Sequence, residues 1–378
     1  MRIAFASFRY FPYGGLEKDM LRMAECAAKR GHHVTVISGS WEDDSIPDIP
    51  GLDVEVLKVS GWSNHKRADN FCRRINELFR QRDFDCTIGF NRIPGCDFYF
   101  AADNCYAVEM PKKHSRSVLK IFPRYRTYLA LEERVFRPGA GTKIFYIAER
   151  QKSDYISCYG TEEERFILLP PGMNPACRLL DDAESVRKEK RRALGVADGD
   201  FLLLLLGSNF RQKGGDRAIR AVAGLTPELK KRTKLILAGA DTPDFCRKIA
   251  EKYAVADKVI FPGARKDVPE LLTASDILLL PARNESAGST IVEAISCGVP
   301  VICSAECGFA PYASNACGKV LSEPWSDELF SRAVEEIAVN YPERKAHAVA
   351  HARTVDFTRR ADEAVDALEN FVRTKGAK

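Results

Sequence analysis

The stretch NESAGSTIVEAISCGVPVICS, residues 284–304, places two glutamates around the start of a predicted helix and follows them with an apolar strand. The small residues at 286–288 predict a helix start with unhindered backbone N–H groups, and such a helix end binds anions. If the whole span is helical, Glu293 lies about 12 Å along the axis from Glu285, at about 1.5 Å per residue. That distance matches the reach from the sugar of a nucleotide sugar, past its diphosphate, to the ribose. The spacing therefore predicts that Glu285 binds sugar hydroxyls, that the helix end binds the diphosphate and that Glu293 binds the ribose. Glu293 taken alone would be interpreted as an ordinary exposed helix acid.

Two glycine-containing loops have the composition of phosphate sites. In RYFPYGGLEKD, Gly14 and Gly15 open a predicted helix, so the backbone can approach a ligand closely at a positive helix end. In GSNFRQKGGD, Arg211 and Lys213 precede another predicted helix, where cations suit a phosphate group. Taken singly, the first loop is equally an ordinary turn and the second an ordinary basic loop.

The elements around these loops alternate between short apolar runs and longer helical stretches, which predicts parallel sheets with crossover helices. The strands are expected at 2–8, 33–38, 54–59, 86–90 and 143–148, and then at 201–206, 235–238, 258–261, 277–281 and 299–304. The segment LLPPG separates the two series. The sequence thus predicts an α/β protein of two Rossmann-like domains that face each other across a cleft, residues 1–168 and 169–354. Ligands of such sheets bind at the carboxyl ends of the strands, where all three loops fall.

Composition agrees with this architecture. A chain of 378 residues with 45% hydrophobic and 29% charged residues is typical of a soluble globular protein of about two domains. No signal peptide or membrane-spanning run is recognisable, so we expect a cytoplasmic location. The 12 cysteines form no C-x-x-C pair, which favours buried thiols in a reducing compartment. The few histidines show no metal-ligand spacing.

Several blocks of the sequence together resemble one known family. These blocks are YFPYGGLEKD, RGHHV, FNRIPGCDFYFAADNCYA, KGGDRAI and NESAGSTIVEA. They are similar to the retaining GT-B glycosyltransferases of family 4, and among these to the lipopolysaccharide core glucosyltransferases that add a hexose to inner-core heptose. The resemblance implies the GT-B fold, with the donor bound mainly by the second domain and the acceptor by the first. It also implies that the final helix, within 355–378, crosses back onto the first domain.

The resemblance further implies roles for individual residues. Lys213 would neutralise the donor diphosphate, Gly15 would bring its backbone N–H to the phosphates, and Arg265 would flank the nucleobase. Family members carry a basic residue directly before the lysine, where this chain has Gln212, so Lys213 is expected to contribute more than Arg211. The expected donor-binding set is Gly14, Gly15, Arg211, Lys213, Arg265, Ala287, Gly288 and Glu293.

Catalytic roles are implied for Asp19 and Asp103, which would face the reacting centre and the acceptor hydroxyl, and for Glu285 at the transferred sugar. No Asp-x-Asp motif follows a strand, since DFD at 83–85 precedes one, so we expect no metal and no cofactor. Lys213 and helix N-termini would instead stabilise the UDP leaving group. Retention at the anomeric carbon would proceed by front-face attack or through a covalent carboxylate, and the sequence leaves both open.

A basic segment predicts where the enzyme works. Residues 112–137 hold eight Lys or Arg residues and two acids, with apolar residues at helical spacing. This composition favours an amphipathic surface on anionic lipid, here the inner face of the inner membrane, over an ordinary solvated helix. No nucleic-acid-binding motif is present. We call the predicted membrane-facing cations the basic stripe: Lys113, Arg116, Lys120 and Arg124.

Two other functions share these features. An epimerase with the GT-B fold would act on a nucleotide sugar without a lipid-facing segment. A catalytically silent protein that binds sugar nucleotides would need Glu293 and Lys213 but not Glu285 or Asp103. The resemblance favours a hexosyltransferase that uses a UDP-hexose, and it implies glucose as the expected hexose and lipopolysaccharide inner core as the acceptor.

Overall fold

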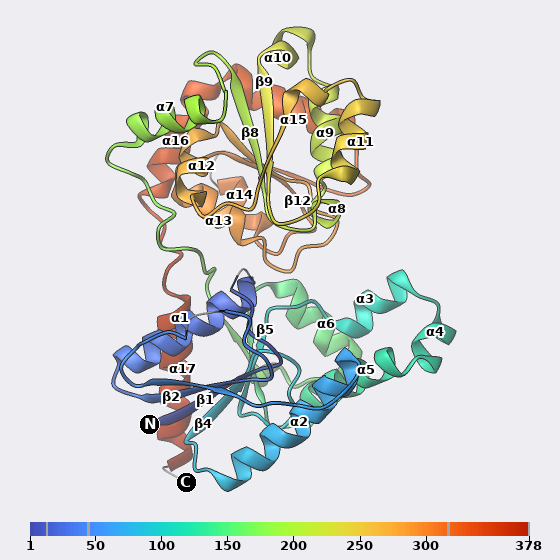
Figure 1. Cartoon of the computed structure of the whole chain (residues 1–378), viewed down its shortest axis with the longest axis vertical. Helices are drawn as coiled ribbons and strands as arrows, with labels where there is room; N and C mark the ends of the chain where they lie inside the picture. Colours follow the sequence, from blue (N-terminus) through green and yellow to red (C-terminus); the bar gives the residue numbers. More distant parts are fainter. Residues whose placement is uncertain (13, 44–45, 316–317, 377–378) are drawn as a thin grey trace. The chain divides into compact units, whose positions relative to one another are not determined.

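The computed structural model describes residues 1–12, 14–43, 46–315 and 318–376. Its contacts divide the chain into two compact units. The first comprises Met1–Pro170 together with Arg359–Lys378, and the second comprises Pro171–Thr358. Each unit is built around one parallel sheet with helices on both faces (Figure 1).

The first unit contains a seven-stranded parallel sheet in the order β3-β2-β1-β4-β5-β6-β7. Its strands are β1 Arg2–Ser7, β2 His33–Ser38, β3 Leu52–Val56, β4 Cys86–Gly89, β5 Phe98–Ala101, β6 Lys143–Tyr146 and β7 Phe166–Leu168. The central strands β4 and β5 are buried along their whole length, as expected for a sheet covered on both faces. The strand order reverses between β1 and β4, so the loops after these two strands diverge and leave room for a ligand.

The helices of the first unit are α1 Gly15–Lys29, α2 Asn64–Gln81, α3 Tyr106–Lys113, α4 Arg116–Ile121, α5 Pro123–Phe136, α6 Glu149–Tyr159 and α17 Arg360–Gly376. The last of these packs against the first helix, where Arg30 pairs with Asp362 at 2.9 Å and with Asp366 at 2.5 Å. Phe371 of α17 also meets Phe98 of β5, with ring centroids 5.1 Å apart. These contacts make α17 a part of this unit.

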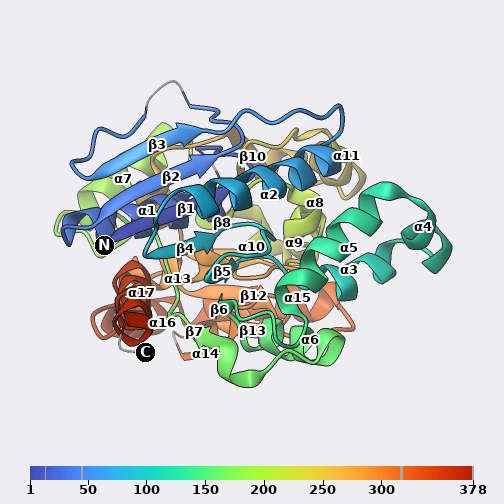
Figure 2. The same cartoon turned by 90° about the horizontal axis from the view of Figure 1, so that it is seen from below.

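The basic segment forms three short helices and not one continuous amphipathic helix. Pro123 begins α5, because its fixed φ suits the first position of a helix and its ring prevents α4 from continuing. The basic stripe is therefore distributed over α3, α4 and α5. Figure 2 shows α4 at the tip of the projection that these helices form, and α5 packs against α2.

The second unit contains a six-stranded parallel sheet in the order β10-β9-β8-β11-β12-β13. Its strands are β8 Phe201–Leu206, β9 Thr233–Ala238, β10 Val259–Gly263, β11 Ile277–Leu280, β12 Val301–Ser304 and β13 Lys319–Leu321. Its helices are α7 Ala183–Ala193, α8 Phe210–Lys213, α9 Gly215–Ala223, α10 Pro227–Lys231, α11 Asp244–Lys252, α12 Val268–Ala274, α13 Ser289–Ser296, α14 Ala310–Asn315, α15 Asp327–Val339 and α16 Tyr341–Ala352.

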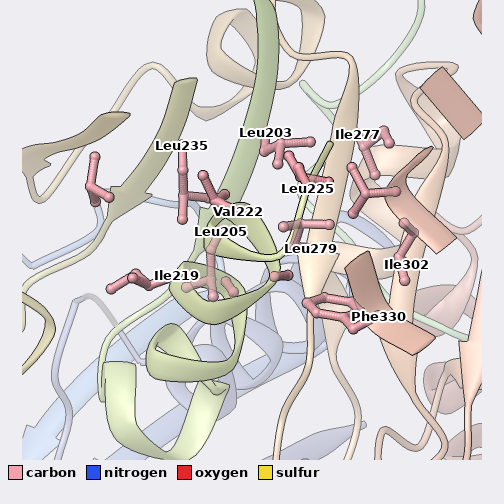
Figure 3. Close-up of a cluster of buried hydrophobic side chains, with 14 of the residues drawn as sticks. Leu203, Leu205, Ile219, Val222, Leu225, Leu235, Ile277, Leu279, Ile302 and Phe330 are labelled. Atoms are coloured by element: carbon pink, nitrogen blue, oxygen red, sulfur yellow. The ribbon is translucent and has the colours of Figure 1, made fainter. Parts of the chain in front are cut away.

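One hydrophobic cluster fixes the central strands of this second sheet. Figure 3 shows Leu203 and Leu205 of β8 close to Ile219 and Val222 of α9, with Phe330 of α15 beside them, and all five side chains are fully buried. The packing of these large apolar groups holds β8 at the centre of the sheet, and the short helix α8 that follows it ends at Lys213.

Candidate functional site

The strand order of the second sheet reverses between β8 and β11, and the loops after these two strands carry the strongest sequence predictions. The loop after β8 leads through Gly207 into α8, which ends at Lys213. The loop after β11 runs from Pro281 to Gly288 and contains Glu285. The fold therefore brings residues more than seventy positions apart to the same edge of the sheet.

Lys213 and Glu285 form an ion pair at this edge. Lys213 Nζ lies 2.7 Å from Glu285 Oε2, and the two side chains are 18% and 16% exposed. A β-carbon on Gly207 would lie 3.1 Å from Cε of the lysine, so glycine leaves the path of the lysine open. The predicted diphosphate residue and the predicted sugar residue are thus held in direct contact, in a partly desolvated position where charge interactions are stronger than in bulk water.

A second ion pair, between Arg283 and Asp216, joins the loop after β11 to the start of α9. Arg283 donates both guanidinium nitrogens to the carboxylate of Asp216, each at 2.8 Å, and also donates to the carbonyl of Arg211 at 2.6 Å. Gln212 donates its side-chain amide to the carbonyl of Asn284 at 2.8 Å. Burial works to raise the pKa of Asp216, but the hydrogen bonds from arginines outweigh it and the pKa is lowered. These hydrogen bonds join the loop after β11 to the segment that carries Lys213.

Close packing at Gly214 explains one glycine of the KGGD motif. Gly214 adopts φ of +79°, and an added β-carbon would lie 2.1 Å from the carbonyl oxygen of Pro281. A side chain at this position would be strained and would also push the two loops apart.

The prediction that residues 286–288 begin the helix is wrong. The helix α13 begins at Ser289, and Gly288 precedes it in the left-handed conformation, with φ of +84°. The residues before it are held as a loop, because Ala287 accepts a hydrogen bond from Phe309 N–H at 2.7 Å and Glu285 N–H donates to Glu306 at 3.0 Å. The separation estimated along a single helix therefore does not describe Glu285 and Glu293. At the start of α13 the N–H of Ile291 donates to the carbonyl of Gly288 at 2.8 Å, which leaves the N–H groups of Ser289 and Thr290 as the ones that an anion could meet.

Glu293 lies in the second turn of α13 and is partly buried, so it is not an exposed helix acid. Its Oε1 atom accepts a hydrogen bond from the backbone N–H of Asn174 at 3.2 Å. The chain after the LLPPG segment therefore passes directly over this carboxylate.

The remaining cations of the predicted donor set have protein partners. The guanidinium of Arg211 lies over the ring of Phe245, 3.7 Å from its centroid, in a cation–π contact. Arg265 is exposed and makes two hydrogen bonds to Asp267, at 2.7 and 2.6 Å, which together with Lys190 lower the pKa of that carboxyl group. Their roles toward a nucleotide stay predictions.

The two glycines of the first unit have different surroundings. Gly14 has an ordinary backbone conformation, but an added β-carbon would collide with the carboxylate of Glu17 at 1.8 Å. Gly15 has open space where its β-carbon would be, with nothing within 4 Å. Gly14 therefore makes room for the Glu17 side chain, and Gly15 is the position where a ligand can approach the backbone. Burial, with the nearby charges of Asp103 and Glu42, raises the pKa of Glu17.

A pocket of about 480 Å³ lies at the carboxyl ends of β1, β2 and β4. Asn91 ties two of these loops together by accepting the N–H of Phe8 at 2.6 Å. This pocket was not predicted from the sequence, although Arg9 and Asn91 stand directly after predicted strands and could have indicated it. Its polar lining consists of Arg9, Glu17, Ser40, Glu42, Asn64, Arg67 and Asn91.

The two predicted catalytic aspartates of this unit differ in exposure. Asp103 follows β5, is 62% exposed and lies 3.6 Å from Arg92, which also donates to the carbonyl of Asn104 at 2.9 Å. Asp19 is mostly buried and pairs with Arg360 of α17 at 2.6 Å. Asp19 thus ties α1 to α17, while Asp103 is largely exposed to solvent beside Arg92; catalysis by either stays a prediction.

Comparisons with known proteins bear on both units. Residues 186–354 match the family model described as glycosyl transferases group 1. The chain is 37% identical over 372 residues to the lipopolysaccharide glucosyltransferase WaaG of Escherichia coli K12, covering 97% of this chain and 98% of that protein.

Two solved structures are similar in fold to this chain. The crystal structure of WaaG, a glycosyltransferase involved in lipopolysaccharide biosynthesis, superposes with a TM-score of 0.89 at 36% identity, covering 97% of this chain and 99% of that one. Anabaena Alr3699/HepE, solved in complex with UDP-glucose, superposes with a TM-score of 0.74 at 17% identity, covering 100% of this chain and 99% of that one. The second similarity shows the fold alone.

Proposed function

Because this chain belongs to the same glycosyltransferase family as lipopolysaccharide glucosyltransferase WaaG and has the GT-B fold, we propose that it moves a hexose from a UDP-sugar to the inner-core heptose of lipopolysaccharide. Glucose is the proposed hexose, because the related Escherichia coli protein is a glucosyltransferase. The observation that carries the proposal is the contact of Lys213 with Glu285 at the reversal point of the second sheet.

In the proposed donor site, Lys213 and the N–H groups at the start of α13 neutralise the diphosphate as it leaves. Glu285 accepts hydrogen bonds from hydroxyls of the transferred sugar, and its contact with Lys213 keeps the sugar and the phosphate on adjacent groups. Glu293 accepts the ribose hydroxyls. The fixed positive groups replace a metal ion in this proposal, so transfer is expected to proceed without one.

The acceptor site in this proposal is the pocket of about 480 Å³ in the first unit, with Asp103 nearby. Its carboxylates and amides suit the hydroxyls of a sugar. The anomeric carbon loses its bond to the β-phosphate oxygen and gains one to the acceptor oxygen. In front-face attack, which we favour, the acceptor proton passes to the departing phosphate and the anomeric configuration is retained.

From the basic stripe we propose that the protein is a cytoplasmic enzyme that binds to the inner face of the inner membrane. All four of its residues are exposed, and Ile121 and Phe122 beside them are 69% and 53% exposed. Exposed apolar groups ringed by cations suit an anionic lipid surface. In the described part of the chain, no helix is long and apolar enough to cross a membrane.

The test is an assay of the purified protein with labelled UDP-hexoses and lipopolysaccharide truncated to its inner core. Label appearing in the glycolipid supports the proposal, and the donor panel identifies the hexose. Isomerised UDP-hexose without transfer would indicate an epimerase, and UDP binding without either reaction would indicate a silent binding protein. Adding a metal chelator tests the proposed independence of metal, since activity should be unchanged.

A further inference from the structure

A groove lies between α2 and α5 of the first unit, apart from the proposed donor and acceptor sites. It consists of two adjoining pockets of about 570 and 390 Å³, which share Asp69, Pro123 and Thr127 as lining residues. The larger one begins at the turn before α2, where Trp62 lines it, and the smaller one continues along α5 to Arg134. The two helices that form its walls pack against each other.

The groove is basic. The one acid among its lining residues is Asp69, whose carboxylate lies 3.6 Å from Arg73. Because Arg73 balances this acid, the other cations give the groove a net positive charge. These cations are exposed and come from both walls: Lys66 from α2, with Arg126 and Arg134 from α5. Such an arrangement attracts an anionic ligand and offers planar guanidinium groups to its phosphates or carboxylates.

The groove also has an aromatic platform at one end. Trp62 is 85% exposed, and Lys66 Nζ lies 4.4 Å from the centre of its ring. An indole presents a flat apolar face on which the C–H face of a sugar ring can lie, while His65 and Asn70 offer polar groups beside it. A platform of this kind distinguishes a sugar from a simple anion.

We propose that this groove binds an anionic saccharide, namely the part of the glycolipid acceptor that lies beyond the sugar being modified. Trp62 stacks on a sugar ring, and Lys66, Arg126 and Arg134 hold phosphate or carboxylate groups. The identity of the saccharide as the acceptor rests on the function proposed above.

The position of the groove supports this assignment. A single turn separates it from the acceptor pocket, because Arg67 lines that pocket and donates to the carbonyl of Gly61, which lines the groove, at 2.8 Å. At its other side the groove is lined by Pro123, directly after the exposed Ile121 and Phe122. An acceptor anchored in lipid, with its terminal sugar in the pocket, would therefore pass along the groove.

The test compares four variants of the full chain with the wild type. The first replaces Lys66, Arg126 and Arg134 by Gln. The matched control replaces three exposed basic residues of the same unit that lie outside the groove, Lys29, Arg80 and Arg137, also by Gln. The third variant is Trp62→Ala, with Trp62→Phe as the conservative replacement that keeps an aromatic face.

Calorimetry with the deacylated oligosaccharide of lipopolysaccharide, its phosphates intact, measures binding without the transfer reaction. We expect the groove variant and Trp62→Ala to bind at least tenfold more weakly, with Trp62→Phe and the control near the wild type. The KM for intact acceptor should rise by a similar factor while kcat and UDP affinity stay unchanged. Removing the phosphates from the oligosaccharide should weaken wild-type binding and abolish the difference between the wild type and the groove variant.

The proposal is wrong if the groove variant binds the oligosaccharide as the wild type does, or if the control loses as much affinity. It is also wrong if the groove variant loses only its binding to phosphatidylglycerol vesicles, because the groove would then hold a lipid headgroup. Failure of the proposed function gives a different pattern: the wild type would bind the oligosaccharide through the groove but transfer no hexose to any acceptor.

Discussion

Replacing Lys213 by Met tests the donor site most directly, because it removes the charge and keeps most of the length of the side chain. Lys213 contacts Glu285 at 2.7 Å in a partly buried position. It is the side chain that we propose as the main cation at the leaving phosphate. The variant Lys213→Met should therefore affect catalysis, nucleotide affinity and stability to different extents.

The magnitudes follow from the surroundings of the pair. Loss of one preorganised donor to a developing negative charge costs about 2.7–4 kcal/mol, so kcat should fall by about 100–1,000-fold. Loss of a charged hydrogen bond to the diphosphate should weaken UDP binding by about 1.5–3 kcal/mol. Breaking a fully buried pair costs about 3–5 kcal/mol and an exposed one below about 1 kcal/mol. Since these side chains are 18% and 16% exposed, we expect unfolding to become easier by about 1–3 kcal/mol.

A double-mutant cycle with Glu285→Gln separates catalysis from stability. The double variant no longer leaves a carboxylate unpaired, so most of the lost unfolding free energy should return in urea titrations. Its kcat and UDP affinity should stay low, because both donor contacts are still missing. Gln212→Ala, which loses an exposed hydrogen bond to Asn284, serves as the control and should cost much less than Lys213→Met.

Two results would refute this reasoning. If Lys213→Met transfers hexose within about fivefold of the wild-type rate, the predicted fall in kcat has not occurred. The lysine then does not face the developing charge. If the double variant regains both stability and kcat, the pair is a structural contact between two loops and the phosphate lies elsewhere.

Three further predictions concern other parts of the chain. Glu293→Ala should weaken UDP binding by about 1–3 kcal/mol in calorimetry if its carboxylate holds the ribose; an unchanged Kd in a folded variant would remove it from the site. Replacing the basic stripe by Gln should release the protein from vesicles containing phosphatidylglycerol in sedimentation, as should high salt, which shortens the Debye length to about 3 Å at 1 M; UDP affinity should not change, and vesicle binding equal to the wild type would contradict the membrane assignment. Burial lowers the pKa of Lys345 to about 8 in the folded protein, whereas its pKa in the unfolded chain is near 10.4. Between these two pH values the unfolded state binds more protons than the folded state. The free energy of unfolding therefore rises with pH in this range. Lys345→Met should therefore be more stable than the wild type in urea at pH 7, with an advantage that shrinks toward pH 10.5; a stability difference that does not vary with pH would show that the charge is not desolvated.

Much of the fold could be predicted because its elements are encoded locally. The run FLLLLL at 201–206 is strand β8, and all six residues are buried, as a strand covered on both faces requires. The loops after β1, β8 and β11 were identified from glycines and charges alone. The short strand β5, Phe98–Ala101, was missed as a strand, since four apolar residues without flanking periodicity do not distinguish a strand from other buried segments.

The sequence by itself determined the residue types of the site, the parallel α/β elements and the family resemblance, because local periodicity, glycines and charges follow from neighbouring residues. Only the tertiary structure decided which of these residues meet. Lys213 reaches Glu285 because β8 and β11 are adjacent in the sheet, and Asp19 pairs with Arg360 although 341 positions separate them. The start of α13 at Ser289 was also decided at long range, by hydrogen bonds from the 306–309 segment that hold the preceding loop. Strand order and such long-range contacts depend on the packing of the whole unit, which local sequence patterns do not specify.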